Sequence, residues 1–391
     1  MSKDGVSASR PNVSDSNITS KRKTSWPFTF FITALVPVVA ATILYQLDSF
    51  DPAPMPPDAL TRHIIDVPAR NDRMLEGSEL VGVGDLKGPE DVAYEPKSGV
   101  IYTGCADGWI NRVTVNDSVS HSVVEKWVYT GGRPLGIAFG RNNEVIVADG
   151  IKGLLNVSRE GTVELLTDEA DGQKFRTTDG VDVAENGIIY FTDASYKYSL
   201  RECSLDIFEG KPHGRLMSYD PATKRTKVLL HDLYFANGVA VSPDQNYVIF
   251  CETPVRRCRK YIIQGKDKGK VDKFIDNLPG IPDNIRYDGE GHYWIALFTG
   301  PSVSWDLAVR YPFIRKGLAI MEKSIGRPHI EKNSGVLAVD LAGKPTAHYY
   351  DHGLSKVTSG IKIGDYLYCG SIVSPYITRL NLKKHPARAT T

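Results

Sequence analysis

The segment PDNIRYDGEGHYWIALF, residues 282–298, consists of two short apolar runs joined by the turn sequence DGEG, residues 288–291. Apolar runs on either side of a Gly-rich turn are typical of two antiparallel β-strands. An acid and an amide, Asp283 and Asn284, stand behind Pro282 at the start of the first strand. Asp and Asn often form turns by hydrogen-bonding to their own backbone, so this segment alone is compatible with a simple turn or with the edge of a site.

The same arrangement recurs along the chain, mostly at intervals of about 45 residues. Each copy has a polar or small residue, usually a following Gly, then a strand, a turn and a second strand. The other copies are PEDVAYEPKSGVIYTGCADG (89–108), PLGIAFGRNNEVIVADG (134–150), TDGVDVAENGIIYFTDAS (178–195), ANGVAVSPDQNYVIFCET (236–253) and TSGIKIGDYLYCGSI (358–372). About 45 residues hold the short strands of one propeller blade. The repeats therefore predict an all-β, six-bladed β-propeller over residues 60–383.

The ends of the repeat region indicate how the ring closes. The last copy ends without an outer strand, and the segment GSELVGVG, residues 77–84, precedes the first copy and can supply that strand. Two stretches, 196–213 and roughly 299–335, are insertions into the repeat. The second contains an amphipathic helical pattern broken at Pro312. It is compatible with a helix packed on the rim or with a lid over one mouth of the channel.

In a propeller the innermost strand of each blade lines the central channel, so equivalent first residues meet at one mouth. These residues are Glu90, Leu135, Asp179, Asn237, Asp283 (with Asn284) and Ser359. Converging carboxylates repel one another unless a cation lies between them. Carboxylate and amide oxygens are the ligands that Ca²⁺ prefers. None of the six register positions holds a His or a Cys, which argues against zinc or copper. The register therefore predicts a Ca²⁺ site, with Asp283 and Asn284 as ligands rather than a turn.

Composition excludes some partners and indicates a compartment. The 391 residues include 47 basic and 46 acidic side chains, a net charge of +1, which gives no overall attraction to nucleic acid. The five cysteines are too few and odd in number for a disulfide framework, but a local Cys251–Cys258 bridge is compatible with a non-cytosolic compartment.

The N-terminus carries a candidate membrane segment. Residues 1–23 are predicted to be a disordered cytosolic tail. Residues 24–47 contain no charged side chain, and this stretch is long enough for a transmembrane anchor. The basic residues 21–23 in front of it favour a type II orientation with a lumenal propeller. A cleaved signal peptide is the alternative. Either way we expect the secretory pathway (endoplasmic reticulum or vacuole), N-glycosylation at Asn116 or Asn156, and a short C-terminal tail at 384–391.

Several motifs resemble, in order, those of the plant strictosidine synthase-like proteins, and the similarity runs from about residue 60 to 383. The motifs are GPEDVAY, GRPLGIAFG, GIIYFTDASYKY, GRLMSYDPATK, FANGVAVSPD and LPGIPDNIRYDGEGHYWIAL. The animal adipocyte plasma membrane-associated protein is similar too, and calcium-dependent paraoxonases and gluconolactonases share the architecture more distantly. The resemblance implies a channel Ca²⁺ held by Glu90, Asn237, Asp283 and Asn284. The blade-three ligand, usually Asn in those hydrolases, is Asp179 here.

Two departures from these relatives bear on activity. Leu135 stands where paraoxonases have a catalytic His, and Thr299-Gly300-Pro301 follows the fifth-blade strand where strictosidine synthases have a catalytic Glu. We therefore expect a lumenal, Ca²⁺-dependent hydrolase of small-molecule esters or lactones, with Asp283 as nucleophile or base. The alternatives are a strictosidine synthase-type enzyme of alkaloid biosynthesis and a non-catalytic, membrane-tethered binding scaffold.

Overall fold

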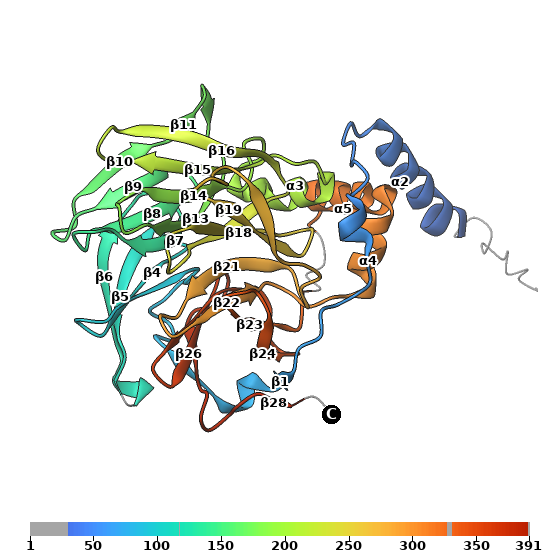
Figure 1. Ribbon diagram of the computed structural model, residues 1–391. Coiled ribbons are helices and arrows are strands. Elements are labelled where there is room, and N and C mark those ends of the chain that lie inside the picture. The colour runs from blue at the N-terminus through green and yellow to red at the C-terminus, as the bar shows by residue number, and fades with distance from the viewer. Residues whose placement is uncertain (1–29, 117, 327–330, 390–391) are drawn as a thin grey trace, which may run out of the picture. The chain divides into compact units, whose positions relative to one another are not determined.

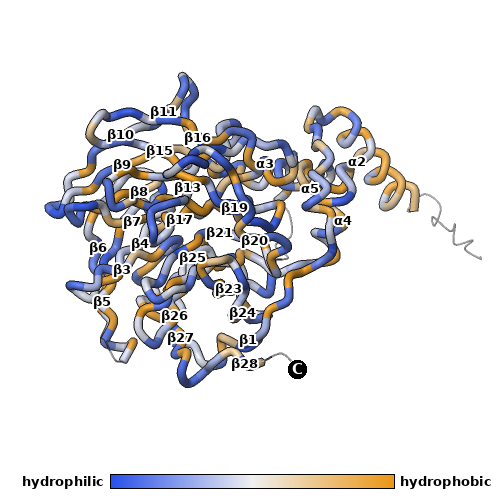
Figure 2. The backbone as a smooth tube through the Cα atoms, in the orientation of Figure 1, coloured by the Kyte–Doolittle hydropathy of each residue, from blue (hydrophilic) through white to orange (hydrophobic). Residues whose placement is uncertain are grey.

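The computed structural model describes residues 30–116, 118–326 and 331–389. The chain divides into two units, Met1–Ser49 and Phe50–Thr391. In the first unit, η1 (Phe31–Leu35) continues into α2 (Val36–Leu47), whose residues are largely apolar and exposed (Figure 2). Among the described residues, no helix is both long and apolar enough to cross a membrane. The predicted tail at 1–23 and residues 24–29 of the predicted anchor lie outside the described residues.

The second unit contains the six blades of the predicted propeller, each with four consecutively paired antiparallel strands (Figure 1). The first three blades are β3 (Val92–Glu95), β4 (Val100–Gly104), β5 (Trp109–Thr114), β6 (Val123–Tyr129); β7 (Pro134–Phe139), β8 (Val145–Asp149), β9 (Gly153–Val157), β10 (Val163–Thr167); and β13 (Thr178–Val183), β14 (Ile189–Asp193), β15 (Gly214–Asp220), β16 (Arg225–Leu233). The last three are β17 (Ala236–Val241), β18 (Tyr247–Glu252), β19 (Arg257–Ile262), β20 (Val271–Ile275); β21 (Pro282–Tyr287), β22 (His292–Leu297), β23 (Ser334–Asp340), β24 (Pro345–Asp351); and β25 (Val357–Ile363), β26 (Tyr366–Ser371), β27 (Ile377–Asn381) with β2 (Ser78–Val81). Other short elements are η2 (Pro57–Leu60), η3 (Met74–Gly77), η4 (Val119–His121) and a hairpin of β11 (Glu169–Ala170) and β12 (Gln173–Lys174).

Ring closure follows the sequence prediction. Strand β2 pairs antiparallel with β27, with Ser78 opposite Leu380, so the segment before the first repeat completes the sixth blade. The fifth blade is extended by β1 (Ala69–Asn71), which runs parallel to β24, and by β28 (Arg388–Ala389), which pairs with β1. The segment predicted as a C-terminal tail therefore contains a strand at 388–389, held because β1 offers it an open edge.

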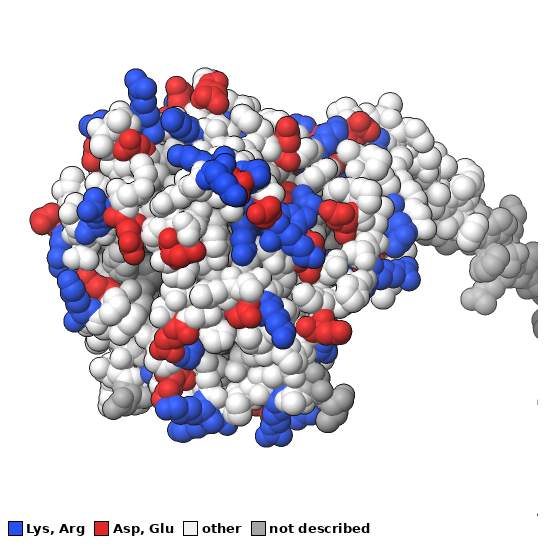
Figure 3. Space-filling view, in the orientation of Figure 1, with Lys and Arg blue, Asp and Glu red and all other residues white. Residues whose placement is uncertain are grey.

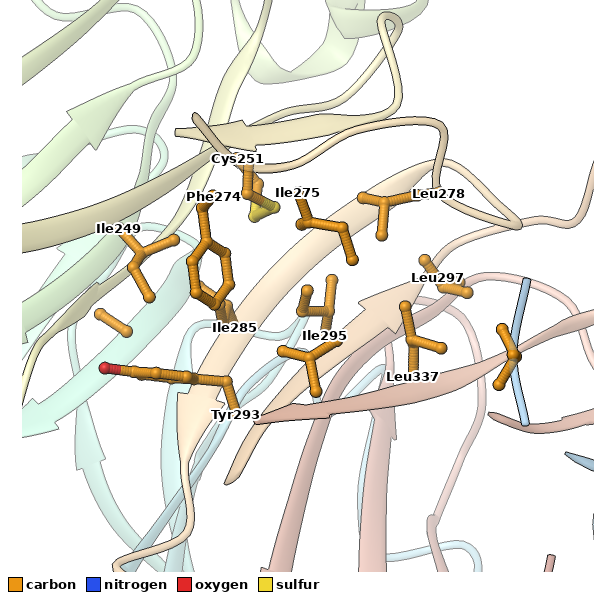
Figure 4. Close-up of a cluster of buried hydrophobic side chains, with 14 residues drawn as sticks. Ile249, Cys251, Phe274, Ile275, Leu278, Ile285, Tyr293, Ile295, Leu297 and Leu337 are labelled. Atoms are coloured by element: carbon orange, nitrogen blue, oxygen red, sulfur yellow. A yellow bond between two sulfur atoms is a disulfide. The ribbon is translucent and has the colours of Figure 1, made fainter. Parts of the chain in front are cut away.

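The hydrophobic core lies between neighbouring blades. Figure 4 shows one such cluster, in which Ile285 and Ile295 of the fifth blade face Ile249 and Phe274 of the fourth. Fully burying a side chain of this size contributes roughly 1.5–3 kcal/mol. The Cys251–Cys258 bridge that the sequence allows is present and joins directly opposed residues of β18 and β19 in the same cluster.

Five of the six inner strands share one irregularity at the repeat's first residue. In β7, β13, β17, β21 and β25 the register with the second strand shifts at this point, for example between Thr178 and Val181. Such bulges redirect side chains. The following Gly allows close approach of neighbouring strands, since a Cβ on Gly136 would lie 2.3 Å from the carbonyl oxygen of Asp179, and one on Gly180 2.7 Å from that of Asn237. The repeated Gly therefore lets the inner strands of neighbouring blades lie close together around the channel.

The two insertions form helices that gather on one side of the strands (Figure 1). The first contains η5 (Leu200–Glu202) and α3 (Cys203–Glu209), and the second contains α4 (Val303–Arg310) and α5 (Pro312–Ser324). Helix α4 begins where the Ser302 hydroxyl accepts a hydrogen bond from the Trp305 amide at 3.1 Å. The predicted break at Pro312 is confirmed, because α5 starts there with a residue that cannot continue α4.

Candidate metal centre

Three carboxylates from three different blades meet in the channel. Glu90, Asp179 and Asp283 each offer an oxygen that lies within 4.8 Å of the other two. Their side chains come from the ends of the inner strands of blades one, three and five, and all three residues are buried. The structure thus brings together acids separated by roughly a hundred residues each, as the repeat register predicts.

Two amides complete the cluster. The Asn284 Nδ2 donates a hydrogen bond to Glu90 Oε1 at 2.8 Å, and the Asn237 side chain hydrogen-bonds to Asp283. Among the described residues, Glu90 Oε2 and Asn237 Oδ1 are buried acceptors with no hydrogen-bond donor. A buried polar atom left unpaired costs about 1–3 kcal/mol. These two unpaired oxygens, together with the carboxylates of Asp179 and Asp283, fit a hard cation, which accepts several oxygen ligands at once.

Burial and mutual repulsion raise the pKa values of these acids. Burial is the main cause for each, followed for Glu90 by the charge of Asp283 and for Asp283 by the charge of Asp179. The pKa of Glu90 and that of Asp283 lie well above the ordinary range, and the pKa of Asp179 is raised to about 7. Without a cation this cluster therefore holds protons near neutral pH.

The two remaining register positions contribute no charged ligand. Leu135 is apolar and buried, and the Ser359 hydroxyl accepts a hydrogen bond from the Gly370 amide at 3.2 Å within its own blade. The candidate ligands are thus the five predicted residues, Glu90, Asp179, Asn237, Asp283 and Asn284.

A second charged layer, which the sequence did not reveal, lies next along the inner strands. The Arg286 guanidinium donates to both carboxylate oxygens of Asp91, with Nε 3.2 Å from Oδ1, and to the carbonyl oxygen of Val181 at 3.4 Å. Asp91 also accepts from the Ile137 amide at 3.0 Å. One guanidinium thereby joins blades one, two, three and five. The sequence holds one signal for this residue: Arg286 lies two positions after Asn284, and alternate residues of a strand share a face.

A cavity of about 260 Å³ leads to the acids. Its walls include residues from α3, α4 and α5, among them Phe208, Trp305 and Leu318. The second insertion therefore does more than pack on the rim: its helices line the space above the candidate ligands. Thr299, the first residue of the Thr299-Gly300-Pro301 segment, lines the cavity with a hydroxyl that donates to the Lys332 carbonyl at 2.9 Å.

The two candidate glycosylation sites differ in setting. Asn116 is exposed in a loop, where its Nδ2 donates to the His121 carbonyl at 2.7 Å. Asn156 is half-buried within β9, opposite Ile146 on one side and Glu164 on the other. An N-linked glycan needs an accessible loop, which Asn116 offers more readily.

Comparisons with known proteins agree with this architecture. Residues 69–113 match the family described as strictosidine synthase-like, N-terminal, and residues 179–266 match strictosidine synthase. The chain is 57% identical over 360 residues to Protein STRICTOSIDINE SYNTHASE-LIKE 6 of Arabidopsis thaliana, covering 92% of this chain and 96% of that protein. It is 33% identical over 371 residues to the adipocyte plasma membrane-associated protein of Gallus gallus, covering 89% of this chain and 88% of that protein.

Solved structures share the fold at low sequence identity. A gluconolactonase from Xanthomonas campestris superposes with a TM-score of 0.56 at 15% identity, covering 86% of this chain and 99% of that one. The calcium-binding protein regucalcin from Agrobacterium tumefaciens gives 0.53 at 14% identity, covering 83% and 98%. These structures support the propeller, and the sequence relatives establish kinship across nearly the whole length. The chain belongs to the strictosidine synthase-like family.

Proposed function

We propose that the protein is a Ca²⁺-dependent hydrolase of small, lipophilic esters or lactones. The observation that carries this proposal is the meeting of Glu90, Asp179 and Asp283 at the end of a largely apolar cavity. The names of two proteins that share the fold, a gluconolactonase and a calcium-binding regucalcin, lend it support. Buried acids and a substrate-sized apolar cavity are the ordinary components of a small-molecule site.

Glu90, Asp179, Asn237 and Asn284 would hold the ion together with Asp283. When bound, Ca²⁺ would supply a Lewis acid that polarises the ester carbonyl and stabilises negative charge on its oxygen. The amides have a further part, because the hydrogen bond from Asn284 fixes Glu90 and that from Asn237 fixes Asp283. Both acids are thereby held in one orientation before substrate arrives.

Asp283 is our candidate for the reacting carboxylate, since it lines the cavity while Asn237 restrains it. As a base it takes a proton from water, and the water oxygen forms a bond to the carbonyl carbon of the ester. The bond between that carbon and the alcohol oxygen then breaks, and the proton passes to the departing alcohol. As a nucleophile, Asp283 would instead form an acyl-enzyme that water hydrolyses.

We further propose that the propeller lies in the lumen of the secretory pathway, anchored by the apolar N-terminal segment. The Cys251–Cys258 disulfide supports this location, because disulfides persist in oxidising compartments.

A substrate panel tests the proposed activity. Purified propeller is assayed with phenyl acetate, with an aliphatic lactone, and with tryptamine plus secologanin, each with Ca²⁺ and with excess chelator. We expect chelator-sensitive hydrolysis of the ester or lactone and no condensation product, since Thr299 supplies no carboxylate. Condensation would favour the synthase alternative. Tight Ca²⁺ binding without turnover of any substrate would favour a binding scaffold, for which Leu135 in place of a catalytic base is the supporting observation.

A further inference from the structure

The cavity wall has an unusual balance of side chains. Half of the lining residues are aliphatic or aromatic, and the others are the candidate ligands Glu90, Asp179, Asn237 and Asp283, six hydroxyl residues, a thiol and one more acid, Glu331. Among the described residues that line the cavity, none is Lys, Arg or His. This contrasts with the molecular face in Figure 3, where basic and acidic side chains are interspersed. A bound molecule would therefore meet no positively charged side chain among the described residues of these walls.

Two buried arginines near the channel are held by other groups. Arg133 is buried, and its guanidinium donates to the carbonyl oxygens of Gly88 at 2.9 Å and Gly104 at 3.4 Å. Arg286 is held by Asp91 in the second layer of the channel. Neither arginine lines the cavity. Both are fixed by contacts that a substrate carboxylate or phosphate would have to break.

The three acids themselves remain net negative with a divalent ion in place, and Arg133, whose charge acts on Glu90 and Asp179, is also acted on by Asp149 and Asp107. Glu90, Asp179 and Asp283 carry three negative charges when ionised, and one divalent cation cancels two of them. A further negative charge in this low-dielectric space would be repelled and stripped of water, whereas an uncharged group would not.

We infer that the cavity selects lipophilic esters that are uncharged or cationic and excludes esters that carry an anionic group away from the reacting carbonyl. This inference rests on the proposed hydrolase function for its chemistry, but its charge rule concerns binding and can be measured separately. For like charges about 10 Å apart, we expect at least a roughly 10-fold lower kcat/KM for an anionic ester than for an uncharged one of the same shape.

The test uses three aryl acetates that differ in the charge of one para substituent. The substituents are tert-butyl (uncharged), trimethylammonium (cationic) and sulfonate (anionic), and each kcat/KM is divided by the rate constant for hydroxide-catalysed hydrolysis. We expect the tert-butyl and trimethylammonium esters to be used at comparable or higher efficiency and the sulfonate ester to be poor. Equal normalised values for all three would overturn the inference.

A charge inserted into the wall provides a matched pair of variants. Ser304 and Val303 are both exposed at the start of α4, but only Ser304 lines the cavity. Ser304→Lys should raise the relative efficiency with the sulfonate ester by roughly 10-fold, and Val303→Lys should leave it unchanged. An equal gain in both variants, or in neither, would contradict a selection made by the cavity.

Binding separates this inference from the hydrolase proposal. The matched aryl ketones, in which a methylene group replaces the ester oxygen, cannot be hydrolysed, and their affinities are measured by calorimetry with Ca²⁺ present. If the sulfonate ketone binds more weakly than the other two while no ester is turned over, the charge rule stands and the hydrolase proposal fails. If esters are hydrolysed but the three ketones bind equally, the hydrolase proposal stands and the charge rule fails.

Discussion

Asn284 donates a 2.8 Å hydrogen bond to Glu90, although 194 positions separate the two residues in the chain. The bond joins the inner strands of the fifth and first blades across the channel. It also occupies Glu90 Oε1, while Glu90 Oε2 remains a buried acceptor with no donor among the described residues. Asn284 thus places a neutral amide where a fourth carboxylate would add to the repulsion among the three existing carboxylates.

Asn284→Asp tests that placement. Without Ca²⁺ the new carboxylate should lower the melting temperature, because it replaces a donor to Glu90 by a like charge. With Ca²⁺ much of the loss should be recovered, so the calcium-dependent rise in melting temperature should exceed that of the wild type. Differential scanning fluorimetry with chelator and with Ca²⁺ measures both values. An equal loss in the two conditions would mean that the fourth acid does not face a cation.

Arg286 is expected to be important for stability. Its guanidinium is buried with Asp91 and joins four blades, and removing one partner of a buried ion pair costs about 3–5 kcal/mol. Arg286→Met should lower the free energy of unfolding by about that amount in urea titrations. Lys362→Met, which removes a surface pair with Glu290, should cost at most about 1 kcal/mol. Similar losses in the two variants would contradict the role given to the buried layer.

Proton release should accompany Ca²⁺ binding. Burial raises the pKa of Asp179 to about 7, so part of the cluster is protonated near neutral pH without an ion. A folded-state pKa above the unfolded value means that the chelated protein loses stability as pH rises from about 4 to about 7. Calorimetry in buffers of different ionisation enthalpy should show protons leaving as Ca²⁺ binds at about pH 6.5. A buffer-independent enthalpy would contradict the protonated cluster, and Asp179→Asn should release fewer protons.

His348 should make the protein acid-sensitive. Burial, with a smaller contribution from Arg70, lowers the pKa of His348 to about 3, and its ring stacks on Tyr350 with centroids 4.4 Å apart. The folded state therefore favours the neutral ring, and the associated stability is present above about pH 6.5 and lost as pH falls toward 3. Between about pH 7 and pH 4.5 the loss should be about 2–3 kcal/mol.

His348→Phe should remove that part of the pH dependence while keeping a stacked ring. The exposed His121→Phe is the matched control and should follow the wild type. Urea unfolding at the two pH values measures the difference. An unchanged slope in His348→Phe would assign the acid sensitivity to other groups.

Glycosylation offers a test of the proposed lumenal location. Asn116 is exposed in a loop, whereas Asn156 is half-buried between two strands. In microsomes the chain should therefore lose mass on glycosidase treatment, and Asn116→Gln should abolish this shift while Asn156→Gln keeps it. No shift in any form would argue against passage of the propeller into the lumen.

The stretch at 282–298 shows both how far sequence reasoning reaches and where it fails. Its repeats predict the blades, and their shared register predicts the meeting of Asp283 with Glu90 and Asp179. Asp288 in the same stretch is the turn residue instead: it accepts hydrogen bonds from the Glu290 and His292 amides at 2.7 and 3.0 Å. Asp283 is thus a candidate ligand, whereas Asp288, five positions later, is a turn residue. Their different positions in the repeat account for the difference.

The residues that sequence reasoning missed depend on contacts between distant segments. Arg286 pairs with Asp91 from another blade, and no local pattern reports such a partner. The cavity wall depends on which faces of α3, α4 and α5 turn inward. An amphipathic pattern shows that a helix has a buried face, but the surface that it covers is set by tertiary packing. The sequence pattern alone is therefore compatible with both the lid and the rim alternative, whereas the folded chain shows that these helices line the cavity.

The calcium response of three variants tests the central claim most directly. Ca²⁺ at about a hundred times its dissociation constant should stabilise the wild type by about 2.7 kcal/mol relative to chelated protein. Glu90→Gln and Asp283→Asn should each lose most of this increment. Asp288→Asn should melt at a lower temperature, since its turn contacts are weakened, yet keep the full increment. Equal calcium-dependent increments in all three variants and the wild type, measured by thermal unfolding, would show that the converging acids do not form a calcium site.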